Sequence, residues 1–215
     1  AKIVIEKCDI GEEAQVVALL ERIREKHGPL RVVVHTAGVL RDALLAKQSE
    51  GSMQHVFSAK AGGAWYLHKH TAKDKLEAFI MYASVSGLVG CPGQSNYSAA
   101  NSYLDQLATY RGSQRLPGIS IQWPGILGVG LAAAMDARVR LTDRYSIGID
   151  AVNCALRLGF DRAASKWTGS LAVIPTPILT DWIQTPGVSG TILSTVAPLL
   201  HASKLGGLGG ESGEV

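Results

Sequence analysis

The sequence has few cysteines and no strong excess of charge. Its three cysteines are far apart in 215 residues and none lies in a CxxC pair, so neither a disulfide framework nor a zinc site is indicated. A reducing compartment is the simplest expectation. The formal net charge is only +3, and no basic cluster has interleaved aromatic residues, which argues against nucleic acid as a partner.

Long hydrophobic runs are also missing. No apolar stretch approaches the roughly 20 residues that span a bilayer. The opening AKIVIEKCD has acidic residues early and no apolar core of the kind found in signal peptides. We therefore expect no membrane partner and a cytoplasmic location, although a plastid would also be compatible. What remains is the composition of an ordinary α/β domain.

Short apolar runs alternate with stretches of helical periodicity. The apolar runs predict strands over 2–10, 30–38, 76–84 and 118–123, with a last strand within 169–182. The runs at 30–38 and 76–84 are nearly all apolar, which is typical of strands buried on both faces of a parallel sheet. Apolar spacing predicts helices over 11–28, 49–71 and 96–114. The alternation predicts right-handed crossovers and an α/β fold with a doubly wound parallel sheet.

Several polar turns converge on one edge of this predicted sheet. Ligands of such sheets bind outside the carboxyl ends of the strands. The residues expected at that edge are Asp9, the turn 35–38, Ser84 and the Pro124-Gly125 pair. We therefore expect the functional site there.

Ser84, Tyr97 and Asn101 lie at fixed spacing around the end of one predicted strand. Tyr97 is 13 residues after Ser84, and Asn101 is four residues after Tyr97. A serine hydroxyl can polarise a carbonyl, and a tyrosine can protonate it when a cation lowers the phenol pKa from about 10. With a lysine, these groups are the minimal equipment for hydride transfer from a nicotinamide to a carbonyl.

The stretch ASVSGLVGCPGQSNYSAAN (83–101) resembles the ketoreductase domains of modular type I polyketide synthases, in the short-chain dehydrogenase/reductase superfamily. Ordinary superfamily members carry lysine one helical turn after the tyrosine, where this chain has Asn101. The ketoreductases exchange the two residues and take lysine from a "K..GaW.LH" stretch. This chain has KAGGAWYLH, with Lys60 placed 24 residues before Ser84.

The resemblance implies a Rossmann-like fold and a role for each of these residues. Tyr97 would donate the proton and Ser84 would orient the carbonyl. Lys60 would lower the pKa of Tyr97 and bind the ribose, and Asn101 would support a water relay. The match extends over roughly residues 1–185 and implies NADPH as cofactor. The cofactor-binding residues it implies are Asp9 and Ile10 of the CDI turn, Ala37 and Gly38 of VVHTAGVL, Lys60, Tyr97, Pro124 and Gly125.

The resemblance also bears on stereochemistry. Ketoreductases that give a D-configured 3-hydroxyacyl product (B-type) carry Leu-Asp-Asp after the turn that corresponds to HTAG (35–38). This chain has Leu40-Arg41-Asp42 there, which keeps the second acid. The opposite subtype has a tryptophan eight residues before the tyrosine, where this chain has Val89. A D-hydroxy product is therefore implied. The residues expected at the substrate are Asp42, Gln94 and Leu131.

The glycine-rich phosphate loop of the superfamily has no counterpart here. No GxGxxG motif occurs in the sequence, and the first predicted strand corresponds to the third of the family's sheet. We therefore expect a partial sequence of a longer polypeptide, with the first βαβ portion missing and a gap in the sheet. Residues 1–190 would form the incomplete ketoreductase domain, and 191–215 a C-terminal segment with a Gly/Ser-rich linker.

Some of these residues also have plainer explanations. Asp9 could cap the following helix instead of contacting adenine, and Asp42 could be a solvated loop acid. Three histidines have no carboxylate or cysteine partner at metal-ligand spacing, so packing or surface positions are favoured and no metal is expected: His35, His68 and His70.

Two functional classes follow from the resemblance. One is an NADPH-dependent oxidoreductase that reduces a 3-oxoacyl thioester on an acyl carrier protein, within a multidomain synthase of polyketides or fatty acids. The other is a non-reducing structural domain of such an assembly. A free-standing short-chain reductase fits less well, because those enzymes carry lysine at the position of Asn101.

Overall fold

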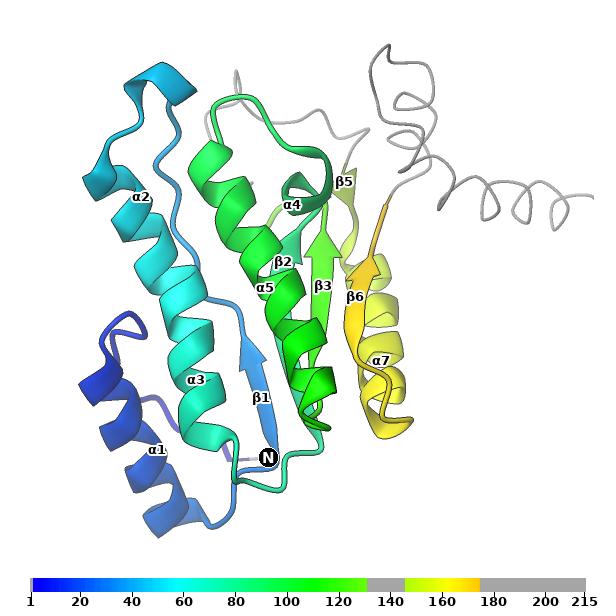
Figure 1. Cartoon of the computed structure of the whole chain (residues 1–215). Helices are drawn as coiled ribbons and strands as arrows, with labels where there is room; N and C mark the ends of the chain where they lie inside the picture. The colour runs from blue at the N-terminus through cyan, green and yellow to red at the C-terminus, as the bar shows by residue number, and fades with distance from the viewer. Residues whose placement is uncertain (1, 131–145, 175–215) are drawn as a thin grey trace, which may run out of the picture. The chain divides into compact units, whose positions relative to one another are not determined.

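The computed structural model describes residues 2–130 and 146–174, which belong to one compact unit, Ala1–Ile174. Its centre is a four-stranded parallel sheet in the order β1-β2-β3-β6 (Figure 1). A short parallel pair, β4-β5, lies apart from this sheet. The strands are β1 (Val32–His35), β2 (Ala78–Ser84), β3 (Ile119–Trp123), β4 (Gly125–Ile126), β5 (Ser146–Ile147) and β6 (Gly169–Ala172).

Helices cover both faces of the sheet, as a doubly wound fold requires. Helices α1, α3 and α5 lie on one face and α7 on the other (Figure 1). The helical elements are α1 (Glu13–His27), η1 (Leu45–Lys47), α2 (Glu50–Phe57), η2 (Ser58–Gly62), α3 (Gly63–Thr71), α4 (Ser86–Val89), α5 (Ser95–Ser113) and α7 (Ile149–Ala164). The predicted fold class is confirmed, and the predicted helices correspond to α1, α2 to α3, and α5.

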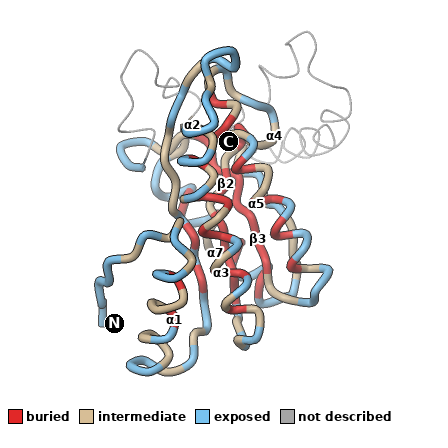
Figure 2. The backbone as a smooth tube through the Cα atoms, turned by 60° about the vertical axis from the view of Figure 1, so that its left-hand side comes forward, coloured by how far each residue is buried: buried red, intermediate tan, exposed pale blue. Residues whose placement is uncertain are grey.

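Strand β2 joins two hydrophobic cores because successive side chains of a strand point to opposite faces. Phe79, Met81 and Ala83 pack with α1, α3 and α5 in one cluster. Ala78 and Ile80 pack with β3 and α7 in the other. Most residues of β2 and all residues of β3 are therefore buried (Figure 2).

Strand β1 is buried on one face only, which corrects the prediction for the run at 30–38. Val33 and His35 are buried, whereas Val32 and Val34 are 37% and 43% exposed. The reason is that α7 lies over β2 and β3 and leaves the second face of β1 uncovered. Burial on both faces holds for β2, as predicted.

The predicted opening strand does not form. Residues 2–8 form neither helix nor strand, and Ile3, Val4 and Ile5 are exposed. A strand needs a hydrogen-bonded neighbour, and among the residues that the structure describes β1 pairs with β2 alone. The sheet therefore ends at β1 instead of containing the expected gap.

Two further expectations concern the end of the chain. Strand β6 provides the predicted last strand, but only over Gly169–Ala172. The rest of the run to 182 and the domain boundary near 190 lie outside the described residues. Helix α7, which covers the second face of the sheet, was not predicted.

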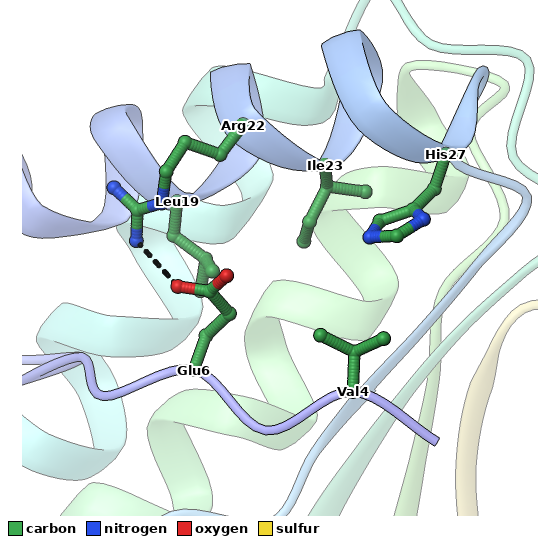
Figure 3. A pocket seen from close by; sticks show the side chains of 6 residues that line it. All are labelled: Val4, Glu6, Leu19, Arg22, Ile23 and His27. Atoms are coloured by element: carbon green, nitrogen blue, oxygen red, sulfur yellow. Dashed lines mark hydrogen bonds and ion pairs between the residues drawn. The ribbon is translucent and has the colours of Figure 1, made fainter. Parts of the chain in front are cut away.

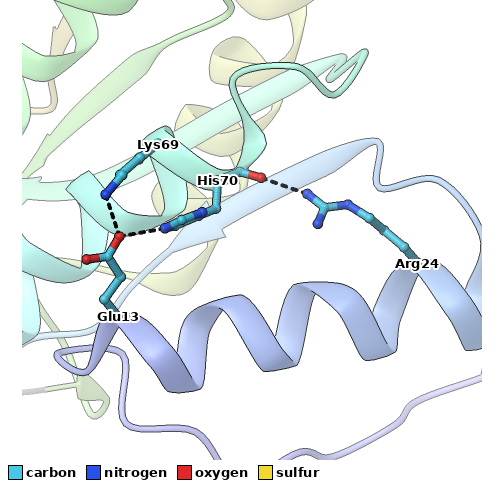
Figure 4. A network of polar contacts seen from close by, with 4 residues as sticks. All are labelled: Glu13, Arg24, Lys69 and His70. Carbon is cyan, nitrogen blue, oxygen red and sulfur yellow. Dashed lines mark hydrogen bonds and ion pairs between the residues drawn. The ribbon is translucent and has the colours of Figure 1, made fainter.

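Hydrogen bonds and ion pairs connect α1 to the end of α3 (Figure 4). Glu13 accepts hydrogen bonds from Lys69 Nζ and His70 Nε2, both at 2.7 Å. Arg24 Nη2 donates to the carbonyl of His70 at 2.7 Å and to Asp74 at 2.8 Å. These side chains are all partly exposed, so each pair adds only modestly to stability and mainly orients the two helices.

A cavity of about 280 Å³ lies between the opening segment and α1, as Figure 3 shows. Val4 and Glu6 face α1 from the segment, and Arg22 closes one side through an ion pair with Glu6 at 3.2 Å. The cavity shares no residue with the predicted site. Within residues 2–130 and 146–174, none of the helices has the length and apolar character needed to cross a membrane.

We expect Gly87→Ala to destabilise the fold, because a Cβ at Gly87 would lie 3.0 Å from the Ser102 nitrogen and 3.0 Å from the Asn101 Cβ. Backbone atoms of α5 cannot give way cheaply, so a loss of about 1–3 kcal/mol in the free energy of unfolding is expected by urea titration. Gly51→Ala is the control. Gly51 is exposed in α2, where alanine should stabilise by about 0.5–1 kcal/mol. Equal stability of the two variants would contradict the close approach.

Candidate active site

The predicted residues meet at the carboxyl end of β2. Ser84 is the last residue of β2, and Tyr97 lies in the first turn of α5. Lys60 lies in η2, a turn of π-helix between α2 and α3. The structure thus brings Lys60 to Tyr97, which is 37 positions further along the chain.

The side chain of Lys60 is buried beside Tyr97. Lys60 is only 3% exposed, and its Nζ lies 5.3 Å from the centroid of the Tyr97 ring. The ammonium donates a hydrogen bond to the carbonyl of Tyr82 at 2.8 Å. Burial lowers the pKa of Lys60 from 10.5 to about 8, and the Asp105 carboxylate acts in the opposite direction. At neutral pH the lysine is therefore still mostly charged.

The π-turn and Gly63 explain how Lys60 can lie so deep. A π-turn inserts one extra residue into a helix and is often found at functional sites. A Cβ at Gly63 would lie 2.8 Å from the Ile10 side chain and 3.2 Å from that of His35. Glycine is needed there so that both side chains can approach η2. Gly63 therefore has a packing role in a helix that it would otherwise weaken.

His35 fixes the backbone at Lys60. Its Nε2–H donates to the Lys60 carbonyl at 2.9 Å, and the side chain is 3% exposed. Burial lowers the pKa of His35 from 6.5 to about 4, with the Lys60 carbonyl opposing and the Lys60 charge adding to the shift. The histidine is therefore neutral at pH 7. The sequence predicted packing or a surface position, and this backbone contact was missed.

Tyr97 keeps its proton at neutral pH. Burial raises the pKa of Tyr97 above 10; the Asn101 side chain opposes this shift, the Asp42 charge adds to it, and the Ser84 side chain opposes it. The direction is opposite to the lowering expected from Lys60. Removal of water from the phenolate is the largest cause of this shift, and the ammonium of Lys60 gives its hydrogen bond to Tyr82 instead of to Tyr97.

Asn101 lies one helical turn after Tyr97 and is fully buried. Its Nδ2 donates to the Tyr97 carbonyl at 2.8 Å. Its Oδ1 has no hydrogen-bond partner among the described residues. A buried acceptor without a partner is costly, so this atom is suited to receive a proton donor from a ligand or solvent.

The hydroxyl oxygen of Ser84 is held by a backbone hydrogen bond. Its Oγ accepts a hydrogen bond from the Ser86 backbone nitrogen at 3.2 Å. A hydroxyl that accepts in this way keeps its own hydrogen for donation. Ser84 can therefore donate to a ligand oxygen at the strand end.

The two described residues predicted at the substrate contact each other. Gln94 Nε2 donates to Asp42 Oδ2 at 2.9 Å. The same two loops are joined by Asn96 Nδ2 to the Arg41 carbonyl at 2.8 Å, and by the Ala43 nitrogen to the Gly93 carbonyl at 2.9 Å. Residues 41–43 and 93–96 thus form one connected wall. Leu131, the third predicted substrate residue, lies outside the described residues.

The predicted cofactor residues lie around the same edge. Ala37 and Gly38 lie just beyond the end of β1, after Thr36; Pro124 is buried after β3, and Gly125 begins β4. Asp9 Oδ1 accepts from the Gly11 nitrogen at 2.9 Å, which orders the turn before α1. The N-cap of α1 is Glu12, so Asp9 is not the helix cap considered from the sequence. Ile10 packs between Gly63 and the core.

Sequence reasoning missed Asp105, which lies in α5 two turns after Tyr97. It is 8% exposed and accepts hydrogen bonds from Ser120 Oγ at 2.6 Å and Gln122 Nε2 at 2.7 Å. The signal was its spacing of four from Asn101. Among the described residues, histidine, cysteine and carboxylate side chains form no group that would hold a metal ion.

The sequence model described as "KR domain" matches residues 1–127. The chain belongs to this ketoreductase-domain family. It is 44% identical over 130 residues to the spectinabilin polyketide synthase system protein NorB of Streptomyces orinoci, which is 60% of this chain and 6% of that protein. Polyketide synthase GfsB of Streptomyces halstedii is 36% identical over 182 residues, covering 83% of this chain and 3% of the relative.

The fold is also similar to that of a solved ketoreductase. A structure described as an A1-type ketoreductase superposes with a TM-score of 0.73 at 30% identity, over 81% of this chain and 36% of that chain. The chain thus spans a small part of its curated relatives and about a third of that ketoreductase.

We expect Lys60→Met to stabilise the ketoreductase domain. A lysine pKa lowered from 10.5 to about 8 penalises folding by up to about 3 kcal/mol at pH 7. The penalty is full below pH 8 and disappears as pH rises towards 10.5, so the advantage of methionine should shrink across that window. Urea titrations at pH 7, 8.5 and 10 measure it.

Lys69→Met is the matched control. Lys69 is 53% exposed and pairs with Glu13 at the surface, so its replacement should change stability by no more than about 0.5 kcal/mol. A pH-independent effect of Lys60→Met would show that Lys60 is not held as a buried cation.

Proposed function

We propose that this chain is the catalytic part of an NADPH-dependent ketoreductase that reduces a 3-oxoacyl thioester to a 3-hydroxyacyl thioester. The observation that carries the proposal is the Lys60 ammonium, buried 5.3 Å from the Tyr97 ring at the strand end that carries Ser84. These groups come from η2, α5 and β2, three separate elements. Such a meeting of a cation, a phenol and a hydroxyl at one sheet edge suits carbonyl reduction.

In the proposed reaction, the substrate carbonyl oxygen lies between Ser84 Oγ and the Tyr97 hydroxyl. Ser84 donates a hydrogen bond that polarises the carbonyl. Tyr97, kept protonated by its raised pKa, transfers its proton to the oxygen as negative charge develops. Lys60 stabilises the phenolate that results, and the acceptor Oδ1 of Asn101 receives the donor that resupplies the proton.

The residues present fit a nicotinamide cofactor. When bound, it supplies the hydride that reaches the carbonyl carbon. Lys60 has three N–H donors, one of which is used by the Tyr82 carbonyl, so the ammonium can also bind ribose hydroxyls. Ala37, Gly38, Pro124 and Gly125 would line the cofactor at the strand ends, with Asp9 and Ile10 towards its adenine.

The wall formed by residues 41–43 and 93–96 would guide the substrate. Gln94 is the N-cap residue of α5, the helix that carries Tyr97, and its side chain donates to Asp42 at 2.9 Å. We propose that this wall selects one face of the carbonyl and gives the D-hydroxy product. An acyl carrier protein would present the thioester, within a cytoplasmic multidomain synthase.

We expect Tyr97→Phe to lower kcat for reduction of a 3-oxoacyl thioester by at least about 100-fold, because the proton donor is lost. NADPH oxidation followed at 340 nm, with the chain in its full natural polypeptide, measures it. Tyr110→Phe makes the same chemical change at an exposed position near the end of α5 and should leave kcat unchanged.

Two outcomes would contradict the proposal. Full turnover in Tyr97→Phe would reject the mechanism. Absence of turnover in the wild type, together with absence of NADPH binding, would favour the non-reducing structural domain considered from the sequence.

We expect the product to have the D configuration at the new hydroxyl. Chiral chromatography of the thioester product, after hydrolysis, distinguishes the two enantiomers. Asp42→Asn removes the charge but keeps a partner for Gln94, and it should lower the enantiomeric ratio with little change in stability. An L product from the wild type would overturn the assignment that rests on Asp42.

A further inference from the structure

Three polar residues lie in one line along α5. Tyr97, Asn101 and Asp105 are spaced by four, which places them on the same face of a helix. That face is turned towards the sheet, because Asn101 is fully buried and Asp105 is bonded to β3. The row begins at Tyr97, the proposed proton donor, and ends at the carboxylate of Asp105.

The carboxylate of Asp105 is held firmly. Ser120 Oγ donates to Oδ1 at 2.6 Å and Gln122 Nε2 donates to Oδ2 at 2.7 Å. Ser120 and Gln122 are two apart in β3, so both side chains lie on the face that α5 covers. Burial raises the pKa of Asp105, whereas the hydrogen bonds from Ser120, Gln122 and Ser170 and the charge of Lys60 oppose this shift and favour the ionised carboxylate.

The buried ammonium of Lys60 needs such an anion. Its hydrogen-bond acceptor, the Tyr82 carbonyl, is neutral. The titratable side chains around it are His35 from β1, which is neutral, and Tyr97 and Asp105 from α5. A buried cation without a compensating anion loses its proton.

Tyr82, which accepts the hydrogen bond of Lys60, pairs with Ile121 of β3, and Asp105 is bonded to Ser120 and Gln122 on either side of Ile121. The carboxylate is thus held on the neighbouring strand at the same register, and its charge opposes the loss of the Lys60 proton.

We propose that Asp105 is a positioning residue of the active site, whose carboxylate, fixed on β3 by Ser120 and Gln122, keeps the ammonium of Lys60 charged beside Tyr97. Asp105 touches neither substrate nor cofactor and acts through Lys60. The proposal deepens the proposed ketoreductase function and rests on it for its catalytic consequence, whereas the coupling between the two charges is independent of turnover.

The first test is the pH profile of kcat for Asp105→Asn in the full natural polypeptide. Without the anion, Lys60 should lose its proton about one pH unit lower. The loss of activity should then be about fivefold at pH 8 and less than twofold at pH 6.5. Ser120→Ala removes a hydrogen bond but keeps the charge, so its profile should keep the wild-type alkaline limb. Equal loss at every pH in Asp105→Asn would show a purely structural role and overturn the proposal.

The second test needs no activity, so failure of the proposed function is separable from failure of this inference. Urea midpoints are measured for the wild type, Asp105→Asn, Lys60→Met and the double variant at pH 7. Asp105→Asn should lower the midpoint in the wild type, and should lower it less, or raise it, when Lys60 is methionine. An equal decrease in both backgrounds would mean that the two side chains are uncoupled and would overturn the proposal.

Discussion

A positive charge held out of water is the constraint on which the rest of this site depends. The Lys60 ammonium is 3% exposed, and an isolated ion at such a position is strongly disfavoured. The chain meets this constraint with three features: the π-turn that carries Lys60 inward, the Tyr82 carbonyl that accepts its hydrogen bond, and the carboxylate of Asp105 on α5. The neutral His35 adds no competing charge while it fixes the turn.

The sequence predicted what depends on local pattern and on family spacing. Strands β2 and β3, helix α5 and the fold class followed from periodicity, and Lys60 was found because Asn101 stands where lysine is usual. The structure brings Lys60 beside Tyr97, with Ser84 and Asn101 at the same end of the sheet. The roles of these residues remain proposals, because spacing identifies a site but not its activity.

What the sequence could not predict depends on partners far along the chain. Residues 2–8 have the β-branched character of a strand, yet they remain unpaired because propensity supplies no neighbour. One face of β1 is exposed because α7 covers only the strands beside it. The pKa of Tyr97 is raised and not lowered as expected, because burial, which residue spacing does not reveal, is the largest cause of its shift. Asp105 was overlooked because its partners Ser120 and Gln122 come from β3.

These long-range dependencies make assembly of the site and folding of the sheet one event. The Lys60 carbonyl is fixed by β1, its ammonium by β2, and the opposing charge of Asp105 by β3. Each strand thus contributes one contact to the surroundings of a cation that is costly to bury. Tyr97 and Asn101 share helix α5 with Asp105, so docking of that helix on β3 positions the proton donor and completes the electrostatic surroundings of Lys60 together. Burial of the Lys60 ammonium lowers the free energy of unfolding, and it places a charged lysine beside Tyr97 where water is excluded.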